Sequence, residues 1–233
     1  MQYNLATLNQ FRVSQPGQSE IVRQPLYDFQ LMPTAGQAQL SFFQNPVGQG
    51  ITSAVGAPVG TAKSFADTNM RASGQLSAGM QFIMESIEVI FEPGSSAAAS
   101  TFVNANPAQF AAANAATVLA ALSDVNTFRV SGWLELFILS KVYLWNAPMG
   151  AFPPMTRLEI DAAIATTSAT AGEVTAATAH AAGRPFFVDP QITLDSNTNF
   201  SVSLNWPGLV PTPSGFNARV GVVLDGVVYR TAQ

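Results

Sequence analysis

The stretch that decides the fold is Asn199–Trp206, which reads NFSVSLNW. Phe200, Val202, Leu204 and Trp206 alternate strictly with Asn and Ser residues. A period of two over eight residues is typical of an antiparallel strand that buries one face and leaves the other in water. The sequence therefore predicts an antiparallel sheet whose outer face is solvated at this strand.

Other apolar stretches predict further strands along the chain. Ser86–Glu92 (SIEVIFE) places Ile87, Val89 and Phe91 on one face, and Pro93-Gly94 follows as a turn that closes the strand. The remaining predicted strands are Ala38–Gln44, Thr127–Leu139, Lys141–Asn146, Pro185–Asp195 and Asn217–Arg230.

The last of these strands contains Asp225-Gly226, a pair that suits either a type I′ hairpin turn or a β-bulge. We favour a bulge or tight bend within one long strand, because a hairpin would leave two short strands.

Helical signals are sparse. Asn106-Pro107 is a suitable N-cap and first-turn pair. The Ala-rich stretch that follows predicts one helix of roughly four turns, ending near Asp124 and depending on packing for its stability. A second Ala- and Thr-rich segment, residues 161–183, is expected to hold either a short helix over Glu173–Ala182 or a surface loop.

Irregularly spaced strands with long loops and little helix predict an all-β fold. We expect an eight-stranded jelly-roll sandwich or barrel, most simply a single barrel with one or two short helices. Residues 1–36, rich in Gln and Pro, are expected to form an extended N-terminal arm. Residues 37–233 are expected to form the jelly-roll domain, with insertions near residues 93–126 and 148–184.

The composition is low in the residues that most chemistry requires. The 233 residues include no Cys and one His, and 10% are charged while 48% are hydrophobic. About 25% charged residues is usual. The lack of Cys excludes disulfides and thiolate metal sites. The net charge of −4 and the lack of a basic arm argue against nucleic-acid binding. We expect uncharged surface of this kind to be buried against neighbouring subunits.

No stretch has the uninterrupted apolar length of a membrane span, and the first residues lack the pattern of a signal peptide. We therefore expect the protein to be made and assembled in a cytoplasm.

His180 and three glutamates are the candidates for catalysis or metal binding. His180 lies among small residues, so we interpret it as a surface or loop residue rather than a ligand or a base. Glu85, Glu88 and Glu92 form the densest acidic group, and two of them share a strand face that could hold a cation. We interpret that face as a solvated one that discourages edge pairing.

The other candidates have simpler interpretations. Asp189, Asp195 and Asp225 adjoin Pro, Ser-Asn or Gly, which indicates turns. Four aromatic residues could stack on a carbohydrate or a base, although strand aromatics are more often core or interface: Trp133, Phe137, Tyr143 and Trp145. We therefore predict no catalytic, cofactor-binding or metal-binding residues, no cofactor and no enzymatic activity.

Two stretches resemble the jelly-roll capsid proteins of tailless icosahedral bacteriophages. Asp67–Glu92 (DTNMRASGQLSAGMQFIMESIEVIFE) resembles the segment in which a T-N and a G-x-L lead through a Phe into a long barrel strand. The closing GVVLDGVVYR, residues 221–230, resembles the last barrel strand of such proteins. The resemblance covers about a fifth of the chain.

This resemblance implies a capsid subunit that self-assembles into trimeric capsomers of an icosahedral shell. It implies localisation in the virion, with further copies and other capsid proteins as partners. Double-barrel relatives are generally longer than 233 residues, so one barrel with insertions is the simpler expectation. The missing basic arm implies that genome condensation is not the task of this chain. Either an underlying membrane or another protein then lies beneath the shell, or a packaging machine drives the DNA in.

Two other classes of function stay open from the residues alone. One is a receptor-binding, decoration or lectin-like module with a local site near Trp133, Trp145 or Trp206. The other is a glycosidase on a jelly roll, which would need two carboxylates in one cleft.

Overall fold

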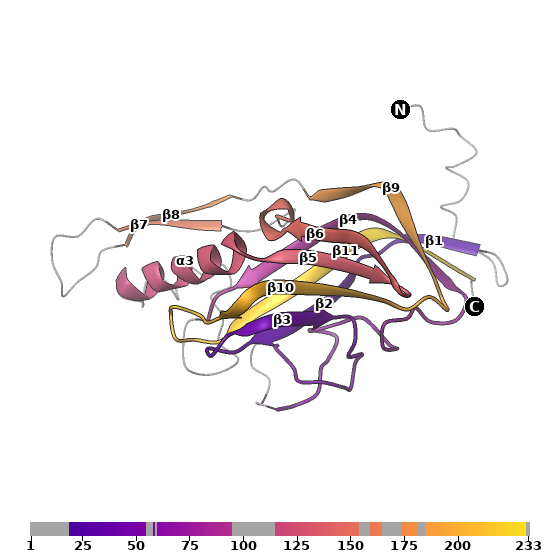
Figure 1. Cartoon of the computed structure of the whole chain (residues 1–233), viewed down its shortest axis with the longest axis horizontal. Helices are drawn as coiled ribbons and strands as arrows, with labels where there is room; N and C mark the ends of the chain where they lie inside the picture. Colours follow the sequence, from indigo (N-terminus) through magenta and orange to yellow (C-terminus); the bar gives the residue numbers. More distant parts are fainter. Residues whose placement is uncertain are drawn as a thin grey trace.

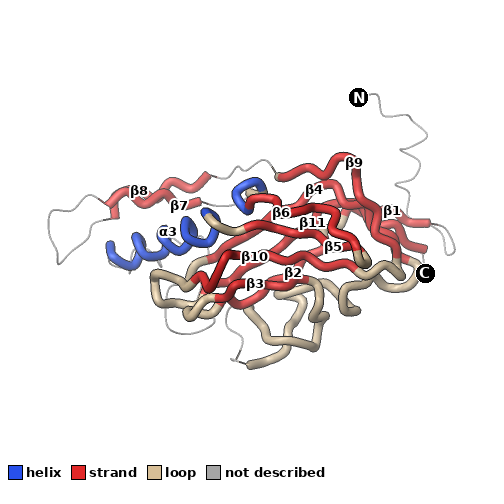
Figure 2. The backbone as a smooth tube through the Cα atoms, viewed as in Figure 1, coloured by secondary structure: helices blue, strands red, loops and turns tan. Residues whose placement is uncertain are grey.

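Two antiparallel sheets pack face to face and enclose one hydrophobic core (Figures 1 and 2). The computed structural model describes residues 19–54, 58, 60–94, 115–153, 159–164, 174–180 and 185–231. In this part of the chain the protein is mostly β, as the sequence predicts. The two sheets do not close on each other, so the architecture is a sandwich and the closed-barrel form is not seen.

The larger sheet, which we call sheet A, has five strands. They are β1 (Ser19–Arg23), β2 (Leu26–Met32), β4 (Met80–Glu92), β9 (Phe186–Asp195) and β11 (Ala218–Thr231). Their order is β1-β11-β4-β9, and β2 also pairs with β11.

The smaller sheet, which we call sheet B, has four strands in the order β3-β10-β5-β6. They are β3 (Gln37–Phe42), β10 (Phe200–Val210), β5 (Trp133–Ile138) and β6 (Lys141–Pro148). All of the pairings in both sheets are antiparallel.

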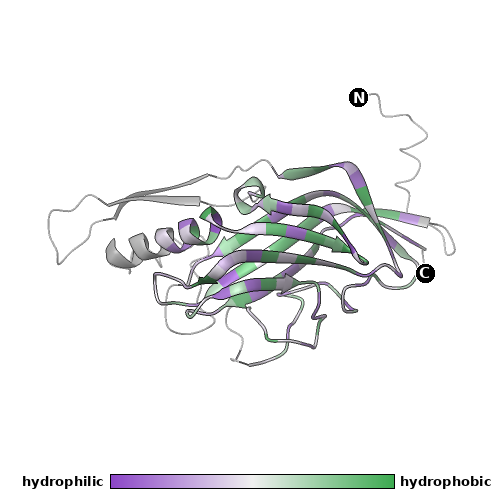
Figure 3. Ribbon diagram, in the orientation of Figure 1, coloured by the Kyte–Doolittle hydropathy of each residue, from purple (hydrophilic) through white to green (hydrophobic). Residues whose placement is uncertain are grey.

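The core is made by the alternating residues of both sheets (Figure 3). On β10, Phe200, Val202, Leu204 and Trp206 are all buried, which confirms the face predicted from their alternation. The inner residues of the facing sheet include Val220, Val222 and Leu224 of β11 and Ile87, Val89 and Phe91 of β4. Burial of such side chains contributes about 1.5–3 kcal/mol each.

The prediction that one face of Asn199–Trp206 is exposed to solvent is wrong in part, because Ser203 and Asn205 are buried. Ser203 lies between Ser41 and Glu135, and Asn205 lies between Gln39 and Trp133. β10 is thus an inner strand of sheet B, and the Asn205 amide donates a hydrogen bond to the Ser203 hydroxyl at 2.9 Å.

The bulge favoured at Asp225-Gly226 is confirmed. The register between β11 and β4 shifts between these two residues, and β11 continues through them to Thr231. A Cβ on Gly226 would lie 2.0 Å from the carbonyl oxygen of Ile83. Glycine is therefore required here because the two backbones approach too closely for a side chain.

The extended N-terminal arm predicted for residues 1–36 needs correction where the chain is described. Residues 19–23 and 26–32 are β1 and β2, which pair one after the other with β11. β11 spans 14 residues, so it can accommodate both short strands along one edge. Residues 1–18 lie outside the described residues.

The strand predicted over Thr127–Leu139 is wrong in its first part. Helix α3 spans Ala115–Val130, and β5 begins only at Trp133. Phe128 of the helix is buried, and the centroid of its ring lies 4.4 Å from that of Phe91 and 5.3 Å from that of Trp206. This contact fixes the last turn as helix, so the predicted end near Asp124 was too early. The predicted start at Asn106-Pro107 lies outside the described residues.

The short helix or loop predicted over Glu173–Ala182 is also wrong. Val174–His180 is strand β8, paired with strand β7 (Glu159–Ile164) as a separate hairpin. Figure 1 shows this hairpin and α3 at the same end of the sandwich. The β-branched Val174, Thr175 and Thr178 favour a strand once a partner strand is available. A short 3₁₀ helix, η2 (Met149–Ala151), follows β6.

Candidate functional site

The two sheets differ sharply in charge. The strands of sheet A carry eleven charged residues: Glu20, Arg23, Asp28, Glu85, Glu88, Glu92, Asp189, Asp195, Arg219, Asp225 and Arg230. The four strands of sheet B carry only Glu135 and Lys141. Among the strands of the two sheets, the charged residues are therefore concentrated in sheet A.

Ion pairs connect neighbouring strands of sheet A. Arg219 pairs with Glu92 at 3.0 Å, and its guanidinium lies 3.7 Å above the centre of the Phe29 ring. Arg23 contacts both Glu85, at 3.0 Å, and Asp225. These contacts satisfy the charges within one copy of the chain.

The outward-facing residues of sheet B form a surface that we call the neutral face: Gln39, Ser41, Ser201, Trp133, Glu135, Phe137, Val142, Tyr143 and Trp145. Ser203 and Asn205 lie on the same side of the sheet but are buried. Its β3 and β10 side carries amides and hydroxyls, whereas its β5 and β6 side carries aromatic and apolar residues. Glu135, its one acidic group, accepts a hydrogen bond from Asn205 at 3.2 Å.

The most exposed part of the neutral face lies on β6. Leu144 packs against the core, so its neighbours Tyr143 and Trp145 face away from it. Tyr143 is 51% exposed and Trp145 is 79% exposed. Among the described strands β6 pairs only with β5, which leaves its second edge free. Exposed aromatics beside a free edge are suited to contact with another chain.

The aromatics singled out from the sequence are thus divided by the structure. Trp133 and Phe137 are half-buried on β5, while Tyr143 and Trp145 are exposed on β6. Trp206 does not belong to this surface, because it is buried and donates a hydrogen bond to the carbonyl of Phe128 at 3.0 Å.

A second feature is a polar cluster beside β2, in the long connection between β3 and β4 (Figure 2). The buried carboxylate of Asp67 accepts bonds from the Thr52 hydroxyl, at 2.6 Å, and from the backbone N–H and hydroxyl of Ser53, at 2.7 and 2.8 Å. The backbone N–H of Ser64 donates to it at 3.1 Å. Burial would raise the pKa of Asp67, but these hydrogen bonds outweigh burial and lower it.

Next to this cluster lies a fully buried ion pair. The Lys63 ammonium nitrogen Nζ is 2.5 Å from Oδ1 of Asp28, and neither side chain has any exposed surface. Burial raises the pKa of the Asp28 carboxyl, although Lys63 and the N–H of Phe43 oppose that shift. Sequence reasoning missed this pair, because LYDFQLM places apolar residues on both faces of β2 and gives no sign that Asp28 points inward.

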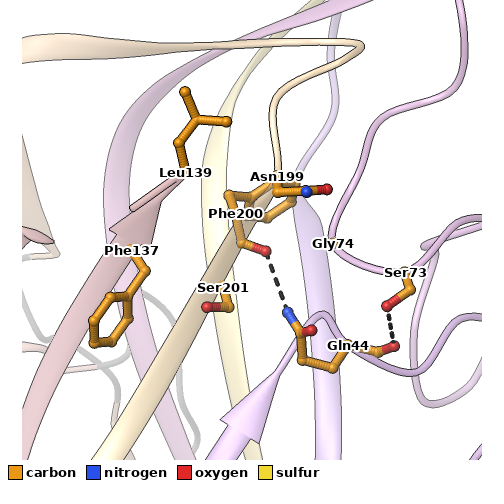
Figure 4. A pocket seen from close by; sticks show the side chains of 8 residues that line it. All are labelled: Gln44, Ser73, Gly74, Phe137, Leu139, Asn199, Phe200 and Ser201. Carbon is orange, nitrogen blue, oxygen red and sulfur yellow. Dashed lines mark hydrogen bonds between the residues drawn. The ribbon is translucent and has the colours of Figure 1, made fainter. Parts of the chain in front are cut away.

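A small surface pocket of about 280 Å³ lies at the start of β10 (Figure 4). It is lined by Gln44, Ser73, Gly74, Phe137, Leu139, Asn199, Phe200 and Ser201. Its polar groups bond to one another: the Ser73 hydroxyl donates to the carbonyl of Gln44 at 2.6 Å, and the Gln44 amide donates to that of Phe200 at 3.4 Å. No titratable side chain lines the pocket, so these residues offer no general acid or base.

The glutamates and the histidine considered as candidates from the sequence do not come together in one site. β4 lies between β11 and β9, so the interpretation of its glutamates as a guard against edge pairing is wrong. Glu88 is buried and Glu92 pairs with Arg219. His180 lies opposite Glu159 in the register of the β7–β8 hairpin.

The aspartates interpreted as turn residues lie in or at the ends of strands. Asp189 precedes Pro190 with a cis peptide bond, Asp195 ends β9, and Asp225 lies at the bulge of β11. Across the described ranges, no three His, Cys, Asp or Glu side chains come together as a metal site would require. None of the described helices is long and apolar enough to cross a membrane.

No protein-family model matches the chain, and no curated protein or solved structure matches it either. The fold and its surfaces define a β-sandwich with one ion-paired sheet and one partly aromatic sheet that carries few charges.

Proposed function

We propose that this chain is a structural virion protein, a self-assembling capsid subunit that builds an icosahedral shell through trimeric capsomers. In this proposal the protein has no catalytic role, and its partners are further copies of itself and other capsid proteins, with either a membrane or another protein beneath the shell. Its site of action is the virion, after assembly in a host cytoplasm.

The strand pairing supports a jelly roll as the finer form of the sandwich. Eight strands pair as nested couples, β2 with β11, β3 with β10, β4 with β9, and β5 with β6. Nested antiparallel couples arise when one long two-stranded ribbon is folded over itself. In the folded ribbon, β11 also pairs with β4, and β10 also pairs with β5. Two sheets of four such strands are the jelly-roll arrangement, and β1 extends one of them.

The observation that carries the proposed function is the neutral face. A neighbour that covers sheet A must keep its ion pairs or strip them of water. A neighbour that covers sheet B meets amides, hydroxyls and aromatic rings, which cost less to desolvate than an unpaired charge. Tyr and Trp are the residues that most often dominate binding at protein interfaces. We therefore assign the β5 and β6 side of the neutral face to contacts between subunits.

Association of the full-length protein tests this assignment. Sedimentation velocity over a dilution series is expected to show trimers and larger species for the wild type, with shells or capsomers in electron micrographs. The double variant Tyr143→Ser, Trp145→Ser is expected to shift these species toward the monomer. Phe65→Ser is the matched control, because Phe65 is 60% exposed but lies outside the neutral face.

Two results would count against the proposal. A wild-type protein that stays monomeric at every concentration would contradict self-assembly. Equal association of the double variant and the wild type would show that other surfaces make the contacts.

The exposed Tyr143 and Trp145 also favour a second candidate, a glycan- or receptor-binding module. Flat aromatic side chains on an exposed strand suit stacking against a sugar ring. This candidate predicts a monomeric or stably trimeric protein that binds immobilised glycans, with binding lost in the same double variant and kept in Phe65→Ser.

A further inference from the structure

Lys63 and Asp28 lie in direct contact at a place that water does not reach. The chain has two lysines, and the other one, Lys141, is exposed at the start of β6. Lys63 has no exposed side-chain surface, and its Nζ lies 2.5 Å from Oδ1 of Asp28. In the register of β2 and β11, Asp28 lies opposite Val222, which is fully buried. The pair therefore sits at the margin of the hydrophobic core.

Because Nζ and Oδ1 are in contact, a proton can pass directly between the two groups. Two isolated charges are costly to bury, and a proton transfer from Nζ to Oδ1 converts them into a neutral amine and a neutral carboxylic acid. Burial, which raises the pKa of the Asp28 carboxyl, acts in the same direction. The neutral amine is a nucleophile, and the neutral acid is an electrophile held against it.

The second carboxyl oxygen of Asp28 is held separately. The backbone N–H of Phe43 donates to Oδ2 at 2.7 Å, and the Gln30 amide approaches the same oxygen at 3.4 Å. Phe43 has a φ of 68°, a left-handed conformation that is uncommon outside glycine. A fixed backbone N–H in a dry site is the type of donor that stabilises the oxyanion of an acyl-transfer intermediate.

We propose that Lys63 and Asp28 become joined by an intramolecular isopeptide bond. The lone pair of Nζ attacks Cγ of Asp28, and the negative charge that develops on Oδ2 is held by the N–H of Phe43. Oδ1 then leaves as water, taking the proton of the carboxylic acid and one proton from Nζ. The products are one secondary amide and one water molecule, so the reaction needs no oxidant and no further reactant.

The bond would connect two segments that lie 35 residues apart in sequence. It would tie β2 of sheet A to the connection between β3 and β4. In a chain without Cys, it would provide the covalent loop closure that disulfides provide elsewhere. This inference does not depend on the proposed function, because it concerns the interior of one subunit.

Tryptic digestion of the denatured full-length protein tests the bond. Lys63 is the one tryptic site between Arg23 and Arg71, and an amide on Nζ blocks cleavage there. The expected product is a single peptide of residues 24–71, lighter than its sequence by one water. Further cleavage after Phe43 by chymotrypsin is expected to leave the two halves linked. Peptides 24–63 and 64–71 at their full masses would overturn the proposal and leave an ordinary ion pair.

Two variants act as matched controls. Lys63→Arg has no amine that could react, so its peptides are expected at full mass with cleavage after residue 63. Lys141→Arg replaces the exposed lysine, and it is expected to keep the linked peptide. Water loss at Asp225-Gly226 would appear in a different tryptic peptide and cannot imitate this result. If Lys63→Arg does not fold, the wild-type digest still decides the question.

Discussion

Replacing Asp67 by alanine removes the acceptor that organises the connection between β3 and β4. The carboxylate accepts four hydrogen bonds, from Thr52, from the N–H and the hydroxyl of Ser53, and from the N–H of Ser64. The hydroxyls can turn toward other acceptors, but the two backbone N–H groups cannot. A buried donor left without a partner costs about 1–3 kcal/mol. Ser53 is buried, but Ser64 is exposed and its N–H can bond to water, so one donor stays buried without a partner. We therefore expect Asp67→Ala to lower the free energy of unfolding by about 1–3 kcal/mol, against totals of about 5–15 kcal/mol for typical proteins.

The assay is equilibrium unfolding in urea at one fixed protein concentration. Asp195→Ala is the matched control, because Asp195 is exposed and accepts a bond from the exposed Gln81 amide at 2.6 Å. Its expected effect is within about 0.5 kcal/mol. The reasoning is refuted if Asp67→Ala costs no more than Asp195→Ala.

The same prediction has a pH dependence of defined sign. The pKa of Asp67 is lowered in the folded protein, from an ordinary value of 3.8. The folded state therefore holds the proton less tightly than the unfolded state does, so the stabilisation is complete above the ordinary pKa. It is lost as the pH falls through the lowered pKa. The difference in stability between wild type and Asp67→Ala should shrink over this acidic range.

Three further predictions concern other buried positions. Phe128→Ala should lower the free energy of unfolding by about 3–5 kcal/mol, because it empties a site between two aromatic rings; urea unfolding checks this, and a loss below about 1 kcal/mol would contradict it. Burial raises the pKa of Asp124 although Ser214 donates to it, so the folded state binds the proton more tightly. Wild-type stability should accordingly fall as the pH rises from 3.8 through the raised pKa. In the Asp124→Asn variant this fall in stability should be absent when the urea unfolding midpoint is measured against pH. Identical pH profiles for the variant and the wild type would refute the role given to Asp124. Gly226→Ala should destabilise the protein in thermal unfolding, because the new Cβ would lie 2.0 Å from the backbone oxygen of Ile83; an unchanged Tm would show that the strands separate easily there.

The surfaces show where sequence reasoning reaches its limit. The low charge of the chain is visible in the sequence, but the uneven division of the charged residues between sheet A and sheet B is not. Arg219 and Glu92 are 127 residues apart and pair because β11 and β4 are neighbours. This pairing could not be predicted from the sequence, because periodicity shows which residues share a face but not which strands are neighbours.

The secondary-structure errors have the same origin. Phe128 is compatible with a strand or a helix, and its contacts with Phe91 and Trp206 select the helix. Val174–His180 is rich in Ala and Thr, and it becomes a strand because Glu159–Ile164 pairs with it. In both segments, contacts between distant residues decided between two local structures of similar energy.

By itself, the sequence determined the all-β class, the core face of Asn199–Trp206, the bulge at Asp225-Gly226 and the scarcity of charge. These are properties of neighbouring residues, which alternation and backbone sterics fix locally. Only the tertiary structure decided that Ser203 and Asn205 are covered, that Lys63 and Asp28 meet in the interior, and that Trp145 stands exposed beside a free strand edge. Each of these depends on which strands become neighbours, because burial and pairing are set by residues far away in the chain.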